Sequence, residues 1–268
     1  MAQDIEALRK RLIGRAKKQV QVKYAETDVH IIRAVSVLND LDNAFNLLAE
    51  DCVEWYSSHF PELYSIVRDN EAFLKIVSGI GERKGISEKA LAKALGESAK
   101  AKDVEAKARA SMGSDIPQQA LKEIMGLAEN ALGLKGKRKE MQAFIEKEME
   151  KLVSNFSRAA GPVLGARLLA QANGLKQLAL MPSSTLQLLG AEKALFRHLK
   201  NKKSKGPKYG FIYGHPLVRN ALAKHKGKLA RSLAGKLVLC ARADFFGEKK
   251  DIATAMMAAL EEKAKRLK

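Results

Sequence analysis

Residues 28–55 read DVHIIRAVSVLNDLDNAFNLLAEDCVEW, and apolar residues recur in them at the first and fourth positions of a seven-residue repeat. A heptad repeat sustained over more than three repeats predicts a long α-helix that packs along a second helix. The first positions are occupied by Ile31, Leu38, Phe45 and Cys52, and the fourth positions by Ala34, Leu41, Leu48 and Trp55. Because Cys52 falls on this seam, we interpret it as a small buried residue and not as a nucleophile.

A second helical pattern further along the chain supplies a partner for this helix. Its apolar residues follow at steps of three and four: Met141, Ile145, Met149, Leu152, Phe156 and Ala159. Residues 62–135 are rich in Ala, Lys and Glu, and glycines and a proline interrupt them. We expect three short helices between these interruptions: one that starts at 86–89, one near 102–111 and one near 118–132. We therefore predict an antiparallel helical hairpin with a helical tip, whose seam includes Ile145 and Leu152.

The composition favours a helical protein without a membrane span. The chain has 268 residues, of which 46% are hydrophobic and only 6% aromatic. No apolar run approaches the ~20 residues that a transmembrane helix needs, and the N-terminus lacks the apolar centre of a secretory signal. The two cysteines exclude a disulfide framework and a four-thiolate zinc site. We expect a soluble, cytoplasmic protein.

The net charge of +18 is confined to the second part of the chain. Residues 1–150 carry 24 Lys and Arg against 24 Asp and Glu, whereas residues 151–268 carry 24 against 6. Charge of one sign repels itself unless a polyanion relieves the repulsion, and nucleic acid is the polyanion that this pattern favours. A generally basic proteome is the alternative explanation, but it does not account for the neutral first part.

The residues contain no catalytic or metal-binding constellation. The zinc-protease motif HExxH, the nucleophile elbow GxSxG and a complete phosphate-binding loop are all absent from the sequence. The five histidines show no metal-ligand spacing with cysteines or carboxylates. We therefore expect a chain without enzymatic activity and without a bound metal.

After Gly161-Pro162 the pattern predicts a set of shorter helices, so that the whole chain is expected to be all-α. They cover residues 163–172, 175–180, 185–199, 228–242 and 251–268. Ser184 and Gln187 have the spacing of a capping box for the third of these helices. Residues 1–24 are basic, and we leave open whether they form an amphipathic docking helix or a terminal arm.

Several motifs of the second part resemble the Nop domain. They are GARLLA at 165–170, LMPSST at 180–185, GAEKALFRHL at 190–199, and the Gly, Lys, Arg and Asp positions of 227–244. The segment EWYSSHFPEL at 54–63 is similar to the coiled-coil segment of the same family. Together these motifs make the whole chain resemble the archaeal scaffold protein of C/D box small ribonucleoproteins, a relative of the nucleolar Nop proteins.

The resemblance implies a division of the chain by partner. Residues 1–26 would dock the fibrillarin methyltransferase, 27–158 would form a coiled-coil domain for self-association, and 159–268 would be the Nop domain. Relatives are expected to carry a larger domain before the first long helix. The alternative here is therefore a methyltransferase-docking surface formed by residues 1–26 together with the start of that helix. The Nop domain would grip C/D box guide RNA whose kink-turn already carries a small ribosomal-protein-like partner. No cofactor is expected on this chain, since S-adenosylmethionine would bind the methyltransferase.

The basic residues of the second part identify candidate contacts to RNA or ribonucleoprotein. Lys193, Arg197 and Lys200 follow at helical spacing, so they share one face, and Arg231, Lys236 and Arg242 lie on another helix. His215 precedes a proline and is either a base-stacking or phosphate-binding residue or an ordinary loop histidine. The complete candidate set is Glu192, Lys193, Arg197, His215, Arg219, Lys228, Arg231, Lys236 and Arg242.

Two points stay open at this level. Glu192 and Lys193 alternatively form an ion pair within the domain, and we expect Phe196 and His198 in the core and Leu199 on a buried face. A free-standing basic nucleic-acid chaperone or nucleoid-type protein is the alternative function, although it does not explain a neutral helical hairpin.

Overall fold

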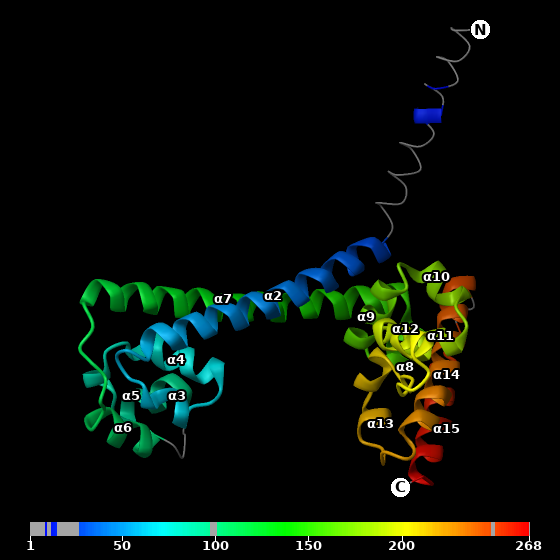
Figure 1. Ribbon diagram of the computed structural model, residues 1–268. Helices are drawn as coiled ribbons and strands as arrows, with labels where there is room; N and C mark the ends of the chain where they lie inside the picture. The colour runs from blue at the N-terminus through cyan, green and yellow to red at the C-terminus, as the bar shows by residue number, and fades with distance from the viewer. Residues whose placement is uncertain (1–8, 10–11, 15–26, 97–100, 248–249, 268) are drawn as a thin grey trace. The chain divides into compact units, whose positions relative to one another are not determined.

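The computed structural model describes residues 9, 12–14, 27–96, 101–247 and 250–267, and over these residues the chain is helical without β-strands (Figure 1). The predicted all-α fold class is therefore confirmed for the described part. The chain divides into two compact units. We call residues 37–141 the hairpin unit, and residues 1–36 together with 142–268 the basic unit. The sequence-based division placed its boundaries after residues 26 and 158.

Two long helices contribute to both units, and short helices fill the rest of the hairpin unit. The elements of this part are α2 (Thr27–Tyr56), α3 (Glu62–Ile66), α4 (Asn70–Ile80), η1 (Arg83–Gly85), α5 (Glu88–Leu95), α6 (Ala101–Arg109) and α7 (Gln118–Leu152). Ser87 caps α5 through a hydrogen bond from the Ala90 amide, as the sequence at 86–89 indicates.

Within the hairpin unit, α2 and α7 run antiparallel. Arg138 Nε donates to Asp42 Oδ1 at 2.5 Å. Closer to the C-terminal end of α2, the Cys52 thiol lies 4.0 Å from the Ile124 carbonyl oxygen. A later position on α2 thus meets an earlier position on α7. This pairing confirms the predicted intrachain antiparallel hairpin.

The buried face of α2 differs from the predicted seam at its C-terminal end. The first heptad positions are buried throughout, but Leu41 and Leu48 are only half-buried and Trp55 is 45% exposed. A straight α-helix drifts about 20° per heptad against a 3.5-residue period, so the fourth positions turn away from the core along the helix. Tyr56 takes the buried place that was expected for Trp55.

The second long helix also differs from the sequence-based expectation. Gly133 and Gly136 do not interrupt it, so the expected helix at 118–132 and the one beginning near 141 form the single helix α7. Instead the chain turns at Val153, whose φ of −142° and ψ of 63° separate α7 from α8 (Ser154–Ala160). Ile145 is buried as predicted, whereas Leu152 is half-buried next to fully buried Val153.

A buried polar network fixes the loops of the hairpin unit. His59 is buried, and its Nε2 accepts a hydrogen bond from the Arg83 amide at 2.9 Å. The Arg83 guanidinium donates to the carbonyl oxygens of His59 and Gly113 at 3.0 and 2.7 Å. Gly113 is required here because an added Cβ would lie 2.0 Å from the His59 carbonyl oxygen.

The basic unit is organised around one long helix, α14. Besides α8, its elements are α9 (Pro162–Gln171), α10 (Leu175–Leu180), α11 (Ser183–Leu188), α12 (Glu192–Lys200), η2 (Phe211–Gly214), α13 (Pro216–Arg219), α14 (Lys226–Phe246) and α15 (Ala253–Lys265). Helix α14 contacts α8, α10, α11, α13 and α15, and Figure 1 shows α15 alongside it. The buried residues of α14 recur about once per helical turn from Leu229 to Ala241 and form the core of this unit.

Asp244 and Asn155 connect three helices of the basic unit. The Asp244 carboxylate accepts hydrogen bonds from the Asn155 and Phe156 amides at 3.2 and 2.8 Å, which caps the start of α8. The Asn155 side-chain oxygen accepts in turn from the Ile252 amide at 2.9 Å, just before α15. Asp244, which belongs to the segment that resembles the Nop domain, therefore stabilises the packing of α8, α14 and α15.

The prediction for the N-terminal segment falls almost wholly outside the described residues, since only 9 and 12–14 of residues 1–26 are described. No helix in the described ranges combines the length and hydropathy needed to cross a membrane.

We predict that Tyr56→Phe lowers the free energy of unfolding by about 1–3 kcal/mol, because the buried Gly81 carbonyl loses its hydroxyl donor. Tyr56 Oη donates to that oxygen at 2.6 Å and is fully buried. Tyr64→Phe is the matched control, since its hydroxyl makes an exposed 3.4 Å contact with Asn70. Urea unfolding followed by the fluorescence of Trp55 measures both, and equal losses for the two variants would contradict the assignment.

Candidate nucleic-acid interface

A cationic cleft of about 540 Å³ lies on the basic unit. It is lined by Ser184, Gln187, Leu188, Pro207, Lys208, Lys224, Gly227 and Arg231. Three of these residues are cations, and none of the described residues that line the cleft is acidic. The positive potential of such a cleft attracts an anion, since no carboxylate on its walls neutralises the three charges.

The cleft is held open by hydrogen bonds between two segments that are distant in the sequence. The Gly210 amide donates to the Gln187 carbonyl oxygen at 2.9 Å, and the Phe211 amide donates to the Leu189 carbonyl oxygen at 2.8 Å. The Gln187 side chain donates to the Lys208 carbonyl oxygen at 2.6 Å. These bonds fix the C-terminal end of the basic loop 201–208 against α11.

The predicted capping box of Ser184 and Gln187 is wrong, because the Gln187 side chain binds the basic loop instead. Gln187 is occupied by the Lys208 carbonyl, and α11 begins after Pro182 without a side-chain cap. The expected single helix over 185–199 is also divided, because Gly190 has a φ of +88° between α11 and α12.

The Glu192 carboxylate accepts hydrogen bonds from the Gly190 amide at 2.7 Å and from Gln171 Nε2 at 3.3 Å. Glu192 therefore stabilises this turn, and these amide partners replace the alternative of an ion pair with Lys193.

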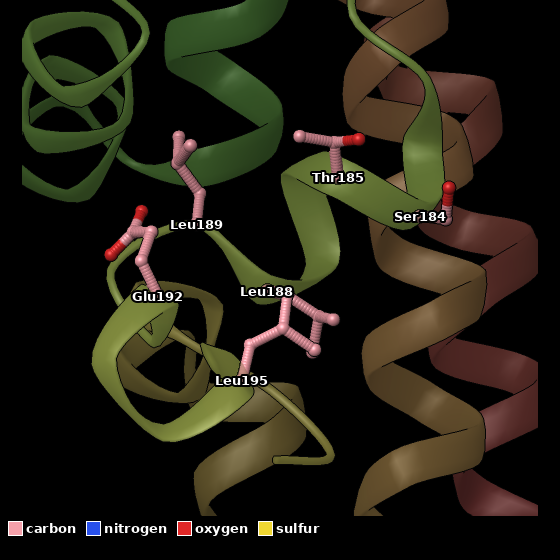
Figure 2. Close-up of a pocket in the computed structure, with 6 residues that line it drawn as sticks. All are labelled: Ser184, Thr185, Leu188, Leu189, Glu192 and Leu195. Atoms are coloured by element: carbon pink, nitrogen blue, oxygen red, sulfur yellow. The ribbon is translucent and has the colours of Figure 1, made fainter. Parts of the chain in front are cut away.

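A smaller apolar groove adjoins the cationic cleft. Its volume is about 230 Å³, and Figure 2 shows the side chains that line it on α11, the following turn and α12. They are Ser184, Thr185, Leu188, Leu189, Glu192 and Leu195. Because Ser184 and Leu188 line both hollows, an apolar and a cationic recess share one wall.

Helix α12 presents cations and apolar side chains together. Lys193, Arg197 and Lys200 are exposed at helical spacing, so the predicted shared cationic face is present. Phe196 and Leu199 are 61% and 62% exposed, which corrects the expectation that both are buried. None of the nine residues of α12 is fully buried, and Leu195 is half-buried where it lines the apolar groove.

His198 lies between core and surface. Its side chain is half-buried, and its Nδ1 contacts the Ser204 carbonyl oxygen at 2.5 Å. The ring also packs against Gly206, where an added Cβ would lie 3.1 Å from it. His198 thus holds the basic loop to α12 and does not belong to the core.

The candidate residues on α13 and α14 occupy different environments. Arg219, Lys228 and Arg231 are exposed, and Arg231 lines the cleft. Lys236 is half-buried. Arg242 Nε donates to the Ala179 carbonyl oxygen at 3.0 Å, so this side chain ties α14 to α10.

His215 is buried, which corrects both interpretations made from the sequence. It is only 8% exposed, so its ring has no open face for a base. Its Nδ1 accepts a hydrogen bond from the Leu217 amide at 3.2 Å and caps α13. Burial lowers the pKa of His215 below its ordinary value, while a hydrogen bond with the Ala159 backbone and the charge of Glu261 act in the opposite direction.

Two of the three cleft cations, Lys208 and Lys224, are not among the candidate residues predicted from the sequence. Both lie in a region where lysines are frequent, and no local pattern separates those that line a cleft from those that do not. Over the described residues, no group of three or more His, Cys, Asp and Glu side chains is placed to hold a metal ion.

The chain is similar to a family model and to individual proteins of one family. Residues 37–266 match the family model described as Nop, snoRNA binding domain, fibrillarin. The chain is 41% identical over 232 residues to an uncharacterised NOP5 family protein of Methanocaldococcus jannaschii, which covers 87% of this chain and 56% of the relative. It is 38% identical over 252 residues to nucleolar protein 58 of Candida albicans, which covers 92% of this chain and 48% of the relative. The chain thus spans about half the length of these curated relatives.

A solved structure shares the fold. The crystal structure of a fibrillarin/Nop5p complex contains a chain that is similar with a TM-score of 0.52 and 22% identity. The match covers 98% of this chain and 78% of the other.

We predict that acid destabilises the basic unit partly through His215. Because its folded-state pKa is lowered, its contribution to stability is present above the unfolded pKa, near 6.5, and is lost as the pH falls below that value. In His215→Asn the side-chain oxygen still caps α13 but does not titrate. The decrease in thermal midpoint from pH 7 to pH 5 is therefore expected to be smaller than in the unaltered chain. An identical decrease in both proteins would show that His215 does not protonate on unfolding.

Proposed function

Because the chain belongs to the Nop family, we propose that it is a non-catalytic scaffold of a C/D box guide ribonucleoprotein. In this proposal the basic unit binds guide RNA, and the particle directs the 2′-O-methylation of RNA by a bound fibrillarin methyltransferase. The methyltransferase carries the S-adenosylmethionine, so this chain needs no cofactor. The particle would act in the cytoplasm.

The cationic cleft is the observation that carries the RNA-binding part of the proposal. Lys208, Lys224 and Arg231 approach one recess from two loops and a helix, with no acidic residue among the described lining. RNA backbone phosphates are bound by such unneutralised cations, which release condensed counterions on binding. The exposed cations of α12 extend the positive surface beyond the cleft.

The adjoining apolar groove supports a composite partner. RNA alone has little to place against Leu188, Leu189 and Leu195, or against exposed Phe196 and Leu199. A small kink-turn-binding, ribosomal-protein-like protein on the same RNA would bring apolar side chains to this surface. We therefore propose that the apolar groove and α12 contact that protein while the cleft contacts the RNA.

The remaining partners are assigned to the rest of the chain. We propose that residues 1–26 and the start of α2 dock the methyltransferase. We also propose that the hairpin unit associates with a second copy of itself, since α2 leaves Leu47 and Trp55 exposed there. Exposed apolar residues of this size on a helix are typical of association surfaces.

A free-standing nucleic-acid chaperone is the second candidate, and the charge distribution favours it equally. It would use the same cations but would need neither the apolar groove nor a protein on the RNA. Gel-shift titration of a C/D box kink-turn RNA, with and without the kink-turn protein, separates the two functions. The scaffold requires tighter binding to the RNA–protein complex, and equal binding to bare RNA of any shape would favour the chaperone.

We predict that Arg231→Met lowers the affinity for the kink-turn complex about tenfold, because one charged hydrogen bond to phosphate is lost. The slope of log K against log salt is expected to become about one unit less negative. Arg266→Met is the matched control, since Arg266 pairs with Glu262 away from the cleft. An unchanged slope for Arg231→Met, or an equal change for Arg266→Met, would argue against the cleft as the RNA site.

A further inference from the structure

Lys226, at the start of α14, is held in place by an aromatic side chain. Its ammonium nitrogen lies 4.8 Å from the centroid of the Tyr213 ring and 3.3 Å from the Tyr213 hydroxyl oxygen. An ammonium group over the face of a tyrosine is attracted by the negative face of the ring. The lysine stem is half-buried, so its position is restricted before any ligand arrives.

Tyr213 itself is rigidly placed. It belongs to η2, whose first residue Phe211 and preceding residue Gly210 are tied by their amides to the turn after α11 and to α11. The Tyr209 ring stacks on Tyr213 with the centroids 5.1 Å apart and the planes 13° apart. The same hydrogen bonds that shape the cleft therefore determine where the Lys226 ammonium lies.

Among the residues that the structure describes, no carboxylate pairs with Lys226, so its charge is oriented but not neutralised there. Other cations of the basic unit pair with carboxylates, as Lys151 does with Glu148 and Arg158 with Asp251. Tyr213 carries no charge, so Lys226 keeps its full attraction for an anion. A side chain that is already ordered loses less conformational entropy on binding than a free surface lysine.

Lys226 also lies beside the cationic cleft in the sequence and in space. Its neighbours Lys224 and Gly227 line the cleft, and Gly227 lies close to Lys208, since an added Cβ would be 3.8 Å from the Lys208 Cβ. Lys226 is therefore next to the wall of the cleft in the chain, and a phosphate bound there would extend the anion-binding surface beyond the cleft.

We propose that Lys226 binds one phosphate of the RNA backbone and that Tyr213 is the positioning residue that orients it. The inference rests on the proposed RNA-binding function and adds two residues to that site. Tyr213 acts through Lys226 and does not itself need to contact the RNA.

The test measures affinity and salt dependence of the full chain for a C/D box RNA whose kink-turn protein is already bound. Lys226→Met is expected to lower the affinity about tenfold and to make the salt slope about one unit less negative. Tyr213→Leu removes the ring face and is expected to lower the affinity about threefold to tenfold, whereas Tyr213→Phe keeps the ring and most of the affinity. Lys263→Met is the control. Lys263 lies on α15, where it donates a hydrogen bond to the Ser232 hydroxyl on α14, and neither residue lines the cleft.

A double-mutant cycle separates positioning from a structural role. If Tyr213 acts through Lys226, Tyr213→Leu causes no further loss in the Lys226→Met background. An equal loss in both backgrounds would overturn the positioning role, and an unchanged salt slope for Lys226→Met would overturn the phosphate site even if Tyr213→Leu does not fold. A chain that binds bare RNA and the complex equally would refute the proposed scaffold, while the slope would still report whether Lys226 binds a phosphate.

Discussion

The close approach of Gly210 to the turn after α11 determines the candidate interface. The Gly210 and Phe211 amides reach the Gln187 and Leu189 carbonyls only because residue 210 has no side chain, since an added Cβ would lie 2.0 Å from the Leu189 carbonyl oxygen. This contact ties the basic loop to α11, brings Lys208 to the cleft that Arg231 also lines, and fixes η2 with Tyr213. The cationic cleft, its shared wall with the apolar groove and the orientation of Lys226 all depend on it.

The uncompensated positive charge of the basic unit lowers the stability of the free protein, and an anionic ligand would reduce this repulsion. From residue 151 to 243 the sequence has 18 Lys and Arg and a single carboxylate, Glu192, and that carboxylate is engaged by backbone and amide donors at the α11–α12 turn. Self-repulsion of this kind destabilises the free unit and is relieved when phosphates bind. The hairpin unit has no such need, because residues 37–141 carry 15 Lys and Arg against 17 Asp and Glu, and cations such as Arg138 and Lys135 lie beside Asp42 and Glu71.

Helix type, helix pairing and the sign of the candidate ligand could be predicted from the sequence, because periodicity and charge are local quantities. The exact buried face of α2 could not, since the drift of the heptad exchanges Trp55 for Tyr56 only after several turns. The division of the expected helix at 185–199 and the burial of His215 depend on contacts with Phe211, Gln171 and Ala159, which are distant in the sequence. For the same reason Lys208, Lys224 and Lys226 were indistinguishable from other lysines until the loops were placed.

The proposed function requires that RNA bind at the cationic cleft. Photo-crosslinking of a 4-thiouridine-substituted C/D box kink-turn RNA to the full chain, followed by mass spectrometry of the linked peptides, tests it most directly. We expect crosslinks in residues 184–231, concentrated in the basic loop and the start of α14. Crosslinks confined to the hairpin unit, or spread evenly over the basic residues of 151–267, would contradict it.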